Sequence, residues 1–167
     1  MPRNEKKGIN WIKTAVKNGH LLATEFKCFY DIRFGKTPEL KKIESTLNYL
    51  AEKGTSARVF NTLAEFAHAQ SKKEGYKEEA ARNYNKSAEM GCLIGMHWIG
   101  VFYQEGFGVT RNLDKAIEML TKAAKLGNAQ SYFQLFLLHS REEEKKDPLT
   151  AYKHLGRAVA MGATFFD

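Results

Sequence analysis

Apolar and small residues recur at fixed distances upstream of five glycines. These glycines are Gly19, Gly54, Gly91, Gly127 and Gly162, and the intervals between them are 35, 37, 36 and 35 residues. A large, mostly aliphatic residue stands seven positions before each glycine, and small residues are common three and four positions before it, as in KSAEMG and KAAKLG. Offsets of three, four and seven share one helix face. The pattern therefore predicts a helix that ends at each glycine, in the left-handed conformation that glycine favours there.

A second apolar segment follows the glycines, most clearly in GCLIGMHWIGVFYQEG and GNAQSYFQLFLLHS. In the first of these segments, Gly95 and Gly100 lack side-chain bulk at positions where we expect a neighbouring helix to approach closely. Pro38 and Pro148 each stand where the first residue of a helix is expected, a position that suits proline. The repeating unit is therefore predicted to be helix, turn, helix.

The period divides the chain into one array of such units. We expect a half repeat at 8–19, repeats at 20–54, 55–91, 92–127 and 128–162, and the start of a further unit at 163–167. The predicted fold class is all-α, an α-solenoid of stacked helix-turn-helix repeats with a period near 36 residues. Because each unit of a solenoid contacts only its neighbours, 1–167 is expected to form a single solenoid domain.

The unit at 92–127 carries a resemblance to a known family. It contains IG at 99–100, GFGV at 106–109, DKA at 114–116 and, at its end, KAAKLGN at 122–128. This arrangement resembles the Sel-one-like repeats, a family of tetratricopeptide-related α-solenoids. The resemblance covers about residues 8–165, and it weakens in the neighbouring units, where SKKEGYKEE and REEEKKDPLT replace the GxGV turn. The resemblance implies the same solenoid architecture for this chain.

The GFGV turn raises the alternative of a phosphate-binding loop. A Walker loop needs GxxxxGK[ST] after a strand, and a dinucleotide loop needs GxGxxG within a βαβ unit. GFGVTR lacks the third glycine, and the segment before it has the pattern of a helix. We therefore expect Gly106 and Gly108 to reverse the backbone and Val109 to pack between helices. Asp114 is expected to begin the next helix, with its carboxylate near the positive end of the helix dipole.

The sequence offers little catalytic chemistry. The five histidines show no HxxxH or HExxH spacing, and there is no GxSxG motif. Cys28 and Cys92 share no motif, and the regular cysteine pairs that secreted Sel-one-like relatives carry in every repeat are absent. We therefore expect no enzyme activity, no cofactor and no metal site. Reduced thiols indicate an intracellular compartment, the cytoplasm ahead of the mitochondrion, and no apolar run approaches the roughly 20 residues of a membrane span.

Function is then expected on the surface of the array. The concave sides of helical arrays hold peptides or partner helices, so we expect a non-catalytic scaffold or adaptor for protein partners, with a small subunit of a larger assembly as one form of it. If the first helix of each unit lines the concave side, the candidate contacts are Arg58, Asn61, Glu65, His97, Trp98, Gln104, Phe133, Gln134 and Leu137.

The ends of the array are a second candidate surface. Trp11 and Ile12 at one end, and Phe165 and Phe166 at the other, have no further unit to cover them. Solenoids normally carry polar caps at both ends, whereas these end residues are apolar. We therefore expect at least one end to dock against another chain. The alternative is that the sequence is a fragment of a longer repeat protein.

Positive charge is concentrated in the first third of the chain. Residues 1–60 contribute +6 of the net charge of +7, from 12 Lys and Arg against 6 Asp and Glu. The candidate basic surface consists of Lys6, Lys7, Lys13, Lys17, Lys41 and Lys42. Because helical repeats of similar length also build arrays that read RNA, the alternative function is RNA binding through this basic third. No fixed polar pair recurs in every unit, however, and a solvated face explains the same charges.

Overall fold

The computed structural model describes residues 5–34, 40–54 and 56–163, and within these ranges the chain is helical and has no strand. The helices are α1 Glu5–Lys17, α2 Leu21–Phe34, α3 Leu40–Glu52, α4 Ala57–Ala69, α5 Tyr76–Glu89, α6 Leu93–Glu105, α7 Leu113–Lys125, α8 Ala129–Arg141 and α9 Pro148–Ala160, with a 3₁₀ turn, η1, at Glu143–Lys145. The all-α prediction is confirmed. The unit boundaries given above stay a prediction.

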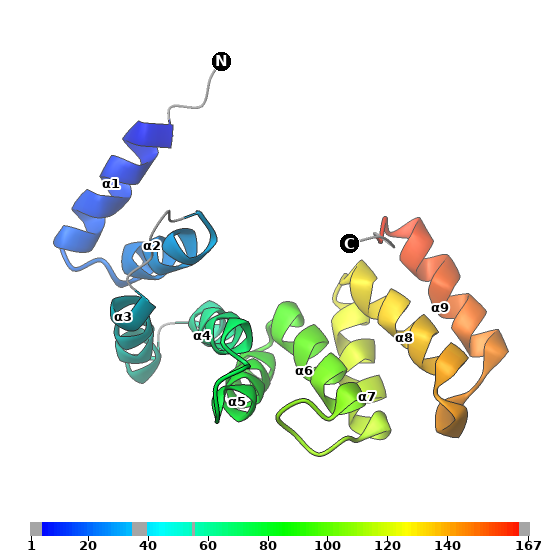
Figure 1. The fold of residues 1–167 in the computed structure, drawn as a ribbon. Helices are drawn as coiled ribbons and strands as arrows, with labels where there is room; N and C mark the ends of the chain where they lie inside the picture. Colours follow the sequence, from blue (N-terminus) through cyan, green and yellow to red (C-terminus); the bar gives the residue numbers. More distant parts are fainter. Residues whose placement is uncertain (1–4, 35–39, 55, 164–167) are drawn as a thin grey trace.

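The helices follow one another in a row that bends into an arc (Figure 1). Each helix packs against the one before and the one after it. We call α2, α4, α6 and α8 the A helices, and α3, α5, α7 and α9 the B helices. Contacts also join α2 to α4 and α6 to α8, which places the A helices toward the inner side of the arc. This sequential packing is the predicted α-solenoid.

The five periodic glycines close α1 and the four B helices as predicted. Their φ angles are all positive, from 64° at Gly54 to 103° at Gly127. At one of these ends the amides of Gly91 and Cys92 donate to the carbonyl oxygens of Ala88 and Ser87, over 2.9 and 3.1 Å. These are the paired hydrogen bonds of a Schellman motif. Glycine is favoured here by its backbone conformation, because a Cβ atom at Gly91 would meet nothing within 4 Å.

Side-chain caps fix where the later helices begin. The Asn112 carboxamide accepts a hydrogen bond from the amide of Lys115 at 3.0 Å, so α7 begins at Leu113. The expectation that Asp114 begins this helix is therefore wrong by one residue, although Asp114 does lie in the first turn. Asparagine is favoured at the N-cap because its side chain satisfies a backbone amide that would otherwise lack a partner.

The last helix begins with the predicted proline. Asp147 caps α9 by accepting from the amide of Thr150 at 3.2 Å, and Pro148 is the first helical residue. Proline loses nothing at this position because its missing amide would have had no partner within the helix. The corresponding prediction for Pro38 lies outside the described residues.

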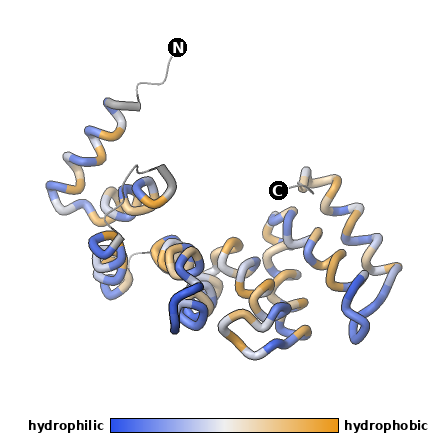
Figure 2. The backbone as a smooth tube through the Cα atoms, in the orientation of Figure 1, coloured by the Kyte–Doolittle hydropathy of each residue, from blue (hydrophilic) through white to orange (hydrophobic). Residues whose placement is uncertain are grey.

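Among the residues that the structure describes, the hydrophobic core forms three clusters along the row, each built by helices that are neighbours in sequence. The first joins α2, α3 and α4, the second α4, α5 and α6, and the third α6, α7 and α8; their largest members are Leu47, Leu50, Tyr84, Phe102, Leu120 and Leu135. The α4–α5 turn and the segment around η1 are hydrophilic (Figure 2). Within the described ranges no single cluster spans the row of helices, as expected for a solenoid in which each unit packs only on its neighbours.

Close approach at two helical glycines sets the spacing of the middle units. A Cβ atom on Gly95 would lie 2.8 Å from the Cβ of Ser87, and one on Gly100 would lie 2.8 Å from the Cγ of Leu120. Contacts that short do not occur between real carbon atoms, so α6 reaches α5 and α7 only because both residues lack a side chain. The expectation of narrow seams at these glycines is confirmed.

The GFGV segment is a turn against α5. Gly106 and Gly108 have φ angles of 70° and 65°, and a Cβ atom on Gly108 would lie 2.2 Å from the carbonyl oxygen of Lys77. Phe107 and Val109 pack against the core cluster of α4, α5 and α6. The element before this turn is the helix α6, and its backbone faces protein atoms. The structural interpretation of the two glycines is therefore confirmed.

Candidate functional site

A groove lies where α2, α4 and the turn between α5 and α6 meet, and we call it the inner groove. Its volume is about 670 Å³. Four large apolar side chains line it, Leu22, Phe26, Met90 and Ile94, and all four are exposed to solvent. Exposed apolar side chains are ordinary when scattered, but four around one groove form a surface that binding would bury favourably.

A buried carboxylate lies in the inner groove. Glu25 on α2 is almost fully buried and accepts a hydrogen bond from Ser56 Oγ at 2.9 Å. Arg58 Nε on α4 lies 3.6 Å from the other carboxylate oxygen. The Arg58 side chain is itself 65 % exposed, so its charge faces solvent while it compensates Glu25. The pair ties the start of one A helix to the A helix before it.

Asn61 is a fourth polar residue of the groove, and it is incompletely hydrogen-bonded. Only 6 % of its surface is exposed, and its Nδ2 donates to Glu65 Oε1 at 3.0 Å. That bond fixes which end of the carboxamide is the oxygen, because the carboxylate accepts only from the NH₂ group. The remaining atom, Oδ1, is buried without a partner. Buried acceptors of this kind are uncommon and costly.

A second, shallower pocket continues along α4. It has a volume of about 380 Å³ and is lined by Glu65, His68, Ala69, Tyr84 and Trp98. The Trp98 ring stacks on Tyr84 with centroids 6.0 Å apart and meets His68 edge-on at 5.6 Å. Glu65 lines this pocket and accepts the hydrogen bond from Asn61, which lines the inner groove. This hydrogen bond therefore links the pocket to the inner groove.

His97 connects two A helices. Its Nδ1 lies 2.9 Å from Oγ of Ser131, which is fully buried on α8. Desolvation by burial lowers the pKa of His97 from 6.5 to about 4. The side chain expected to contact a partner is thus held within the seam between α6 and α8, neutral at physiological pH.

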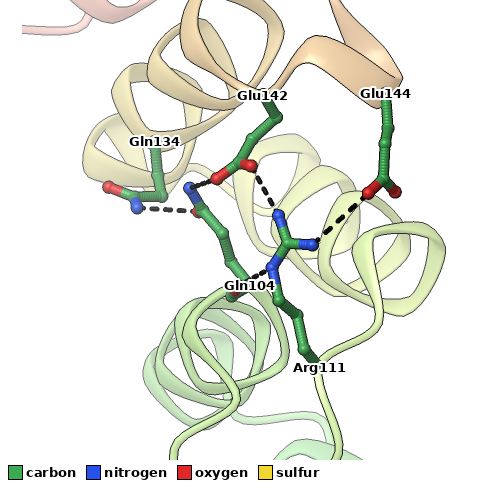
Figure 3. A network of polar contacts seen from close by, with 5 residues as sticks. All are labelled: Gln104, Arg111, Gln134, Glu142 and Glu144. Atoms are coloured by element: carbon green, nitrogen blue, oxygen red, sulfur yellow. Dashed lines mark hydrogen bonds and ion pairs between the residues drawn. The ribbon is translucent and has the colours of Figure 1, made fainter.

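Gln104 and Gln134, also expected on the concave surface, belong to a polar network (Figure 3). Gln134 Nε2 donates to Gln104 Oε1 at 2.9 Å, and Gln104 Nε2 donates to Glu142 Oε1 at 3.4 Å. Arg111 donates to the Gln104 carbonyl oxygen at 3.1 Å and pairs with Glu142 and Glu144 at 2.5 and 3.7 Å. The network joins the turn after α6 to the turn after α8.

The remaining candidate residues lie apart from the inner groove. Phe133 and Leu137 are half-buried on α8, where Phe133 stacks on Phe136 at 5.8 Å. At the N-terminal end, Trp11 is 76 % exposed, whereas Ile12 lines a cavity of about 170 Å³ between α1 and α2. Phe165 and Phe166 lie outside the described residues.

The candidate basic surface is divided between two helices. Lys7, Lys13 and Lys17 are exposed on α1, and Lys41 and Lys42 are exposed on α3. The side chain of Lys6 lies outside the described residues. Within the described ranges, no group of three or more His, Cys, Asp and Glu is placed to hold a metal ion. Among the same residues, no helix combines the length and apolarity that a membrane crossing needs.

Sequence reasoning missed much of the inner groove. Arg58 and Asn61 were named, but Glu25 and the four apolar residues were not. One signal was present in the sequence: Leu22 and Ile94 are apolar at the second position of an A helix, where the equivalent residues in the other units are Arg58 and Gln130. Met90 stands next to a closing glycine, outside the apolar stripe of its own helix.

A row of helical hairpins, narrow glycine seams and an inner surface lined by A helices define the chain as an α-solenoid repeat protein. The family profile of the Sel1 repeat matches residues 1–20, 77–92, 93–128 and 129–162, more than half of the chain. The chain belongs to the Sel1 repeat family, which confirms the resemblance. Sel1 repeat proteins are typically non-catalytic and generally mediate protein–protein interactions.

Two solved structures share the fold. A Sel1 repeat protein from Oxalobacter formigenes has a TM-score of 0.77 and 19 % identity, over 96 % of this chain and 66 % of its own. A protective antigen of uropathogenic Escherichia coli strains, displaying an SLR fold, also has a TM-score of 0.77, with 25 % identity over 92 % of this chain and 33 % of its own. This chain thus spans about two thirds of the length of the Oxalobacter protein and one third of the length of the Escherichia coli antigen. Among the curated proteins there is no match.

Proposed function

We propose that this protein is a non-catalytic interaction scaffold that binds a segment of a partner protein along its inner surface. The observation that carries the proposal is the inner groove, where four exposed apolar side chains surround two buried polar groups, on the side of the arc that the A helices line. Burying such a surface against a partner removes apolar area from water, which is the main favourable term in protein association. A small subunit of a larger assembly is one form that such a scaffold takes.

Site-specific photocrosslinking tests this proposal. A photoreactive amino acid is placed at Ile94, on the wall of the inner groove, or at Arg82, which is exposed on the B helix α5. Each protein is irradiated in native extract, and the crosslinked polypeptides are identified by mass spectrometry. We expect discrete crosslinked partners from position 94 and few from position 82. Equal crosslinking from both positions, or none from position 94, contradicts binding along the inner surface.

RNA binding, the alternative function, has no support from the similar proteins.

Docking through the ends of the solenoid stays a prediction. Trp11 is exposed at one end, and Leu149, Tyr152 and Val159 are exposed on α9 at the other. Light scattering as a function of protein concentration tests whether such a surface joins copies of this chain.

A further inference from the structure

Three of the four A helices place a polar residue at equivalent positions along the inner surface; in the fourth, α8, the equivalent residue is Phe133. Glu25, Asn61 and His97 are separated by 36 residues, one repeat, and lie on α2, α4 and α6. Two of the three are hydrogen-bonded by a serine of the following unit: Ser56 donates to Glu25, and Ser131 bonds to His97. We call this arrangement the polar ladder: at each of these two positions, a serine hydroxyl of one unit is hydrogen-bonded to the polar residue of the unit before it.

The polar ladder is interrupted at Asn61. The positions equivalent to Ser56 and Ser131 in the next unit are Cys92 and Gly95, and neither has a hydroxyl group. Gly95 is enforced by packing, because a Cβ there would lie 2.8 Å from Ser87. As a result, Asn61 Oδ1 remains buried with no donor. Asn61 lines the inner groove at this same position. A ligand in the groove is therefore placed to supply the hydrogen-bond donor that Asn61 Oδ1 lacks.

The groove itself indicates what kind of ligand carries that donor. Its walls are apolar, formed by Leu22, Phe26, Met90 and Ile94, and suit an apolar side chain. A partner helix is a poor match for Asn61, because its backbone amides already donate within the helix. A segment in extended conformation has free amides beside apolar side chains and supplies both.

Arg58 gives the ligand a preferred charge. Its guanidinium lies at the groove with one nitrogen 3.6 Å from Glu25, and 65 % of the side chain faces solvent. A guanidinium carries five N–H donors, so it retains donors for a second carboxylate. The net charge of +6 on residues 1–60 also attracts an acidic segment at long range.

We propose that the inner groove binds an extended, acidic segment of a partner protein, which rests on the function proposed above. One apolar side chain of the segment lies among Leu22, Phe26 and Ile94. A main-chain amide donates to Asn61 Oδ1, and an aspartate or glutamate pairs with Arg58. Oδ1 has almost no water-accessible surface in the free protein, so binding includes a rotation of the Asn61 carboxamide about its soft terminal torsion.

Peptide selection followed by calorimetry tests this inference. Peptides are selected from a random display library on the wild-type chain, and the selected sequences are synthesised and titrated by isothermal titration calorimetry. We expect enrichment of an apolar residue beside Asp or Glu, with no helical signal in the circular dichroism of the complex beyond that of the free protein. A peptide methylated on the backbone nitrogen that meets Asn61 is expected to bind about tenfold more weakly, from loss of a hydrogen bond to a buried acceptor.

A matched pair of variants locates the site. Leu22 and Leu149 are both the second residue of a helix and are 64 % and 67 % exposed, but only Leu22 lines the groove. Leu22→Asp is expected to weaken binding about 10- to 100-fold, the value of one buried leucine, whereas Leu149→Asp leaves it unchanged. Asn61→Leu is expected to bind the methylated and unmethylated peptides equally. Arg58→Gln is expected to lose the preference for acidic peptides. Circular dichroism of each variant checks that it is folded.

The outcomes separate this inference from the proposed function. Selected peptides that bind wild type and Leu22→Asp equally, or that bind as helices or through basic residues, overturn the inference while leaving a peptide-binding scaffold. Failure to select any peptide, together with no crosslinked partner at position 94, overturns both. Equal losses in Leu22→Asp and Leu149→Asp place the binding elsewhere and also overturn the inference.

Discussion

Gly100 on α6 lies against Leu120 on α7 so closely that there is no room for a methyl group between them. A Cβ atom on Gly100 would be 2.8 Å from Leu120 Cγ and 3.2 Å from its backbone nitrogen. Leu120 is fully buried and belongs to the core cluster shared by α6, α7 and α8. The absence of a side chain at residue 100 therefore sets the distance between the two helices of this unit.

Gly100→Ala is expected to destabilise the protein by about 1–3 kcal/mol, because overpacking moves Leu120 or the helices apart. Gly156 is the matched control, since it is also helical, in α9, but a Cβ atom there would meet nothing within 4 Å. Gly156→Ala is expected to stabilise by roughly 0.5–1 kcal/mol, from the higher helix propensity of alanine. Urea denaturation measures both; two changes of the same sign would show that packing at Gly100 is not limiting.

The two glycines of the GFGV turn are expected to differ in their tolerance of alanine. Both have positive φ angles, which cost alanine about 1 kcal/mol. A Cβ atom on Gly108 would also lie 2.2 Å from the Lys77 carbonyl oxygen, whereas the nearest atom to a Cβ on Gly106 would be 3.4 Å away. Gly108→Ala should therefore lower the midpoint of thermal unfolding several degrees more than Gly106→Ala. Equal midpoints for the two variants would argue against the close packing of this turn on α5.

His97 is expected to make stability depend on pH. The pKa of His97 is about 4 in the folded protein, compared with its ordinary value of 6.5, which applies to the unfolded chain. As pH falls, the unfolded chain therefore binds the proton before the folded protein does. The contribution of this residue is complete above pH 6.5 and is lost progressively as pH falls toward 4, by about 3 kcal/mol at most. His97→Asn keeps a polar atom near Ser131 without titrating, and should flatten this part of the curve of unfolding free energy against pH. An unchanged slope would contradict the assignment.

The network around Arg111 is expected to hold the turns locally, with little effect on global stability. The Arg111 side chain is 44 % exposed, and ion pairs in such positions contribute about 1 kcal/mol or less. Arg111→Ala should accelerate amide hydrogen exchange in η1 and in the turn after α6 while changing the urea midpoint little. Lys122→Ala, which removes an exposed pair with Glu118 inside α7, should leave exchange at η1 unaltered. Equal exchange in both variants would show that the network does not restrain the turn.

Much of the fold was predictable because its determinants are local. The closing glycines, the apolar stripe and the proline at residue 148 each act within one or two helical turns, and the glycine and the stripe recur in each unit. The error at Asp114 arose from the same locality, because Asn112 and Asp114 both suit a helix start and only the backbone geometry selects one. The left-handed conformation at the closing glycines was predicted from sequence, and at Gly91 and Gly127 it is accompanied by amide–carbonyl hydrogen bonds.

The candidate site was predictable only in part. Arg58 and Asn61 line the inner groove, but Gln104 and Gln134 are hydrogen-bonded to each other, and His97 is held by Ser131. Which side chains remain available depends on contacts between units, about 30–38 residues apart. A repeat pattern specifies a position on a helix, and it does not specify what the next helix places opposite.

The sequence by itself determined the helices, their order and their closing glycines, since backbone conformation and one-sided burial are set within a single hairpin. The tertiary structure alone decided that Leu22, Phe26, Met90 and Ile94 surround one groove, and that Asn61 Oδ1 has no donor there. These features arise where α2, α4 and α6 approach one another. They depend on the angle between hairpins, which results from packing of side chains that lie far apart in sequence.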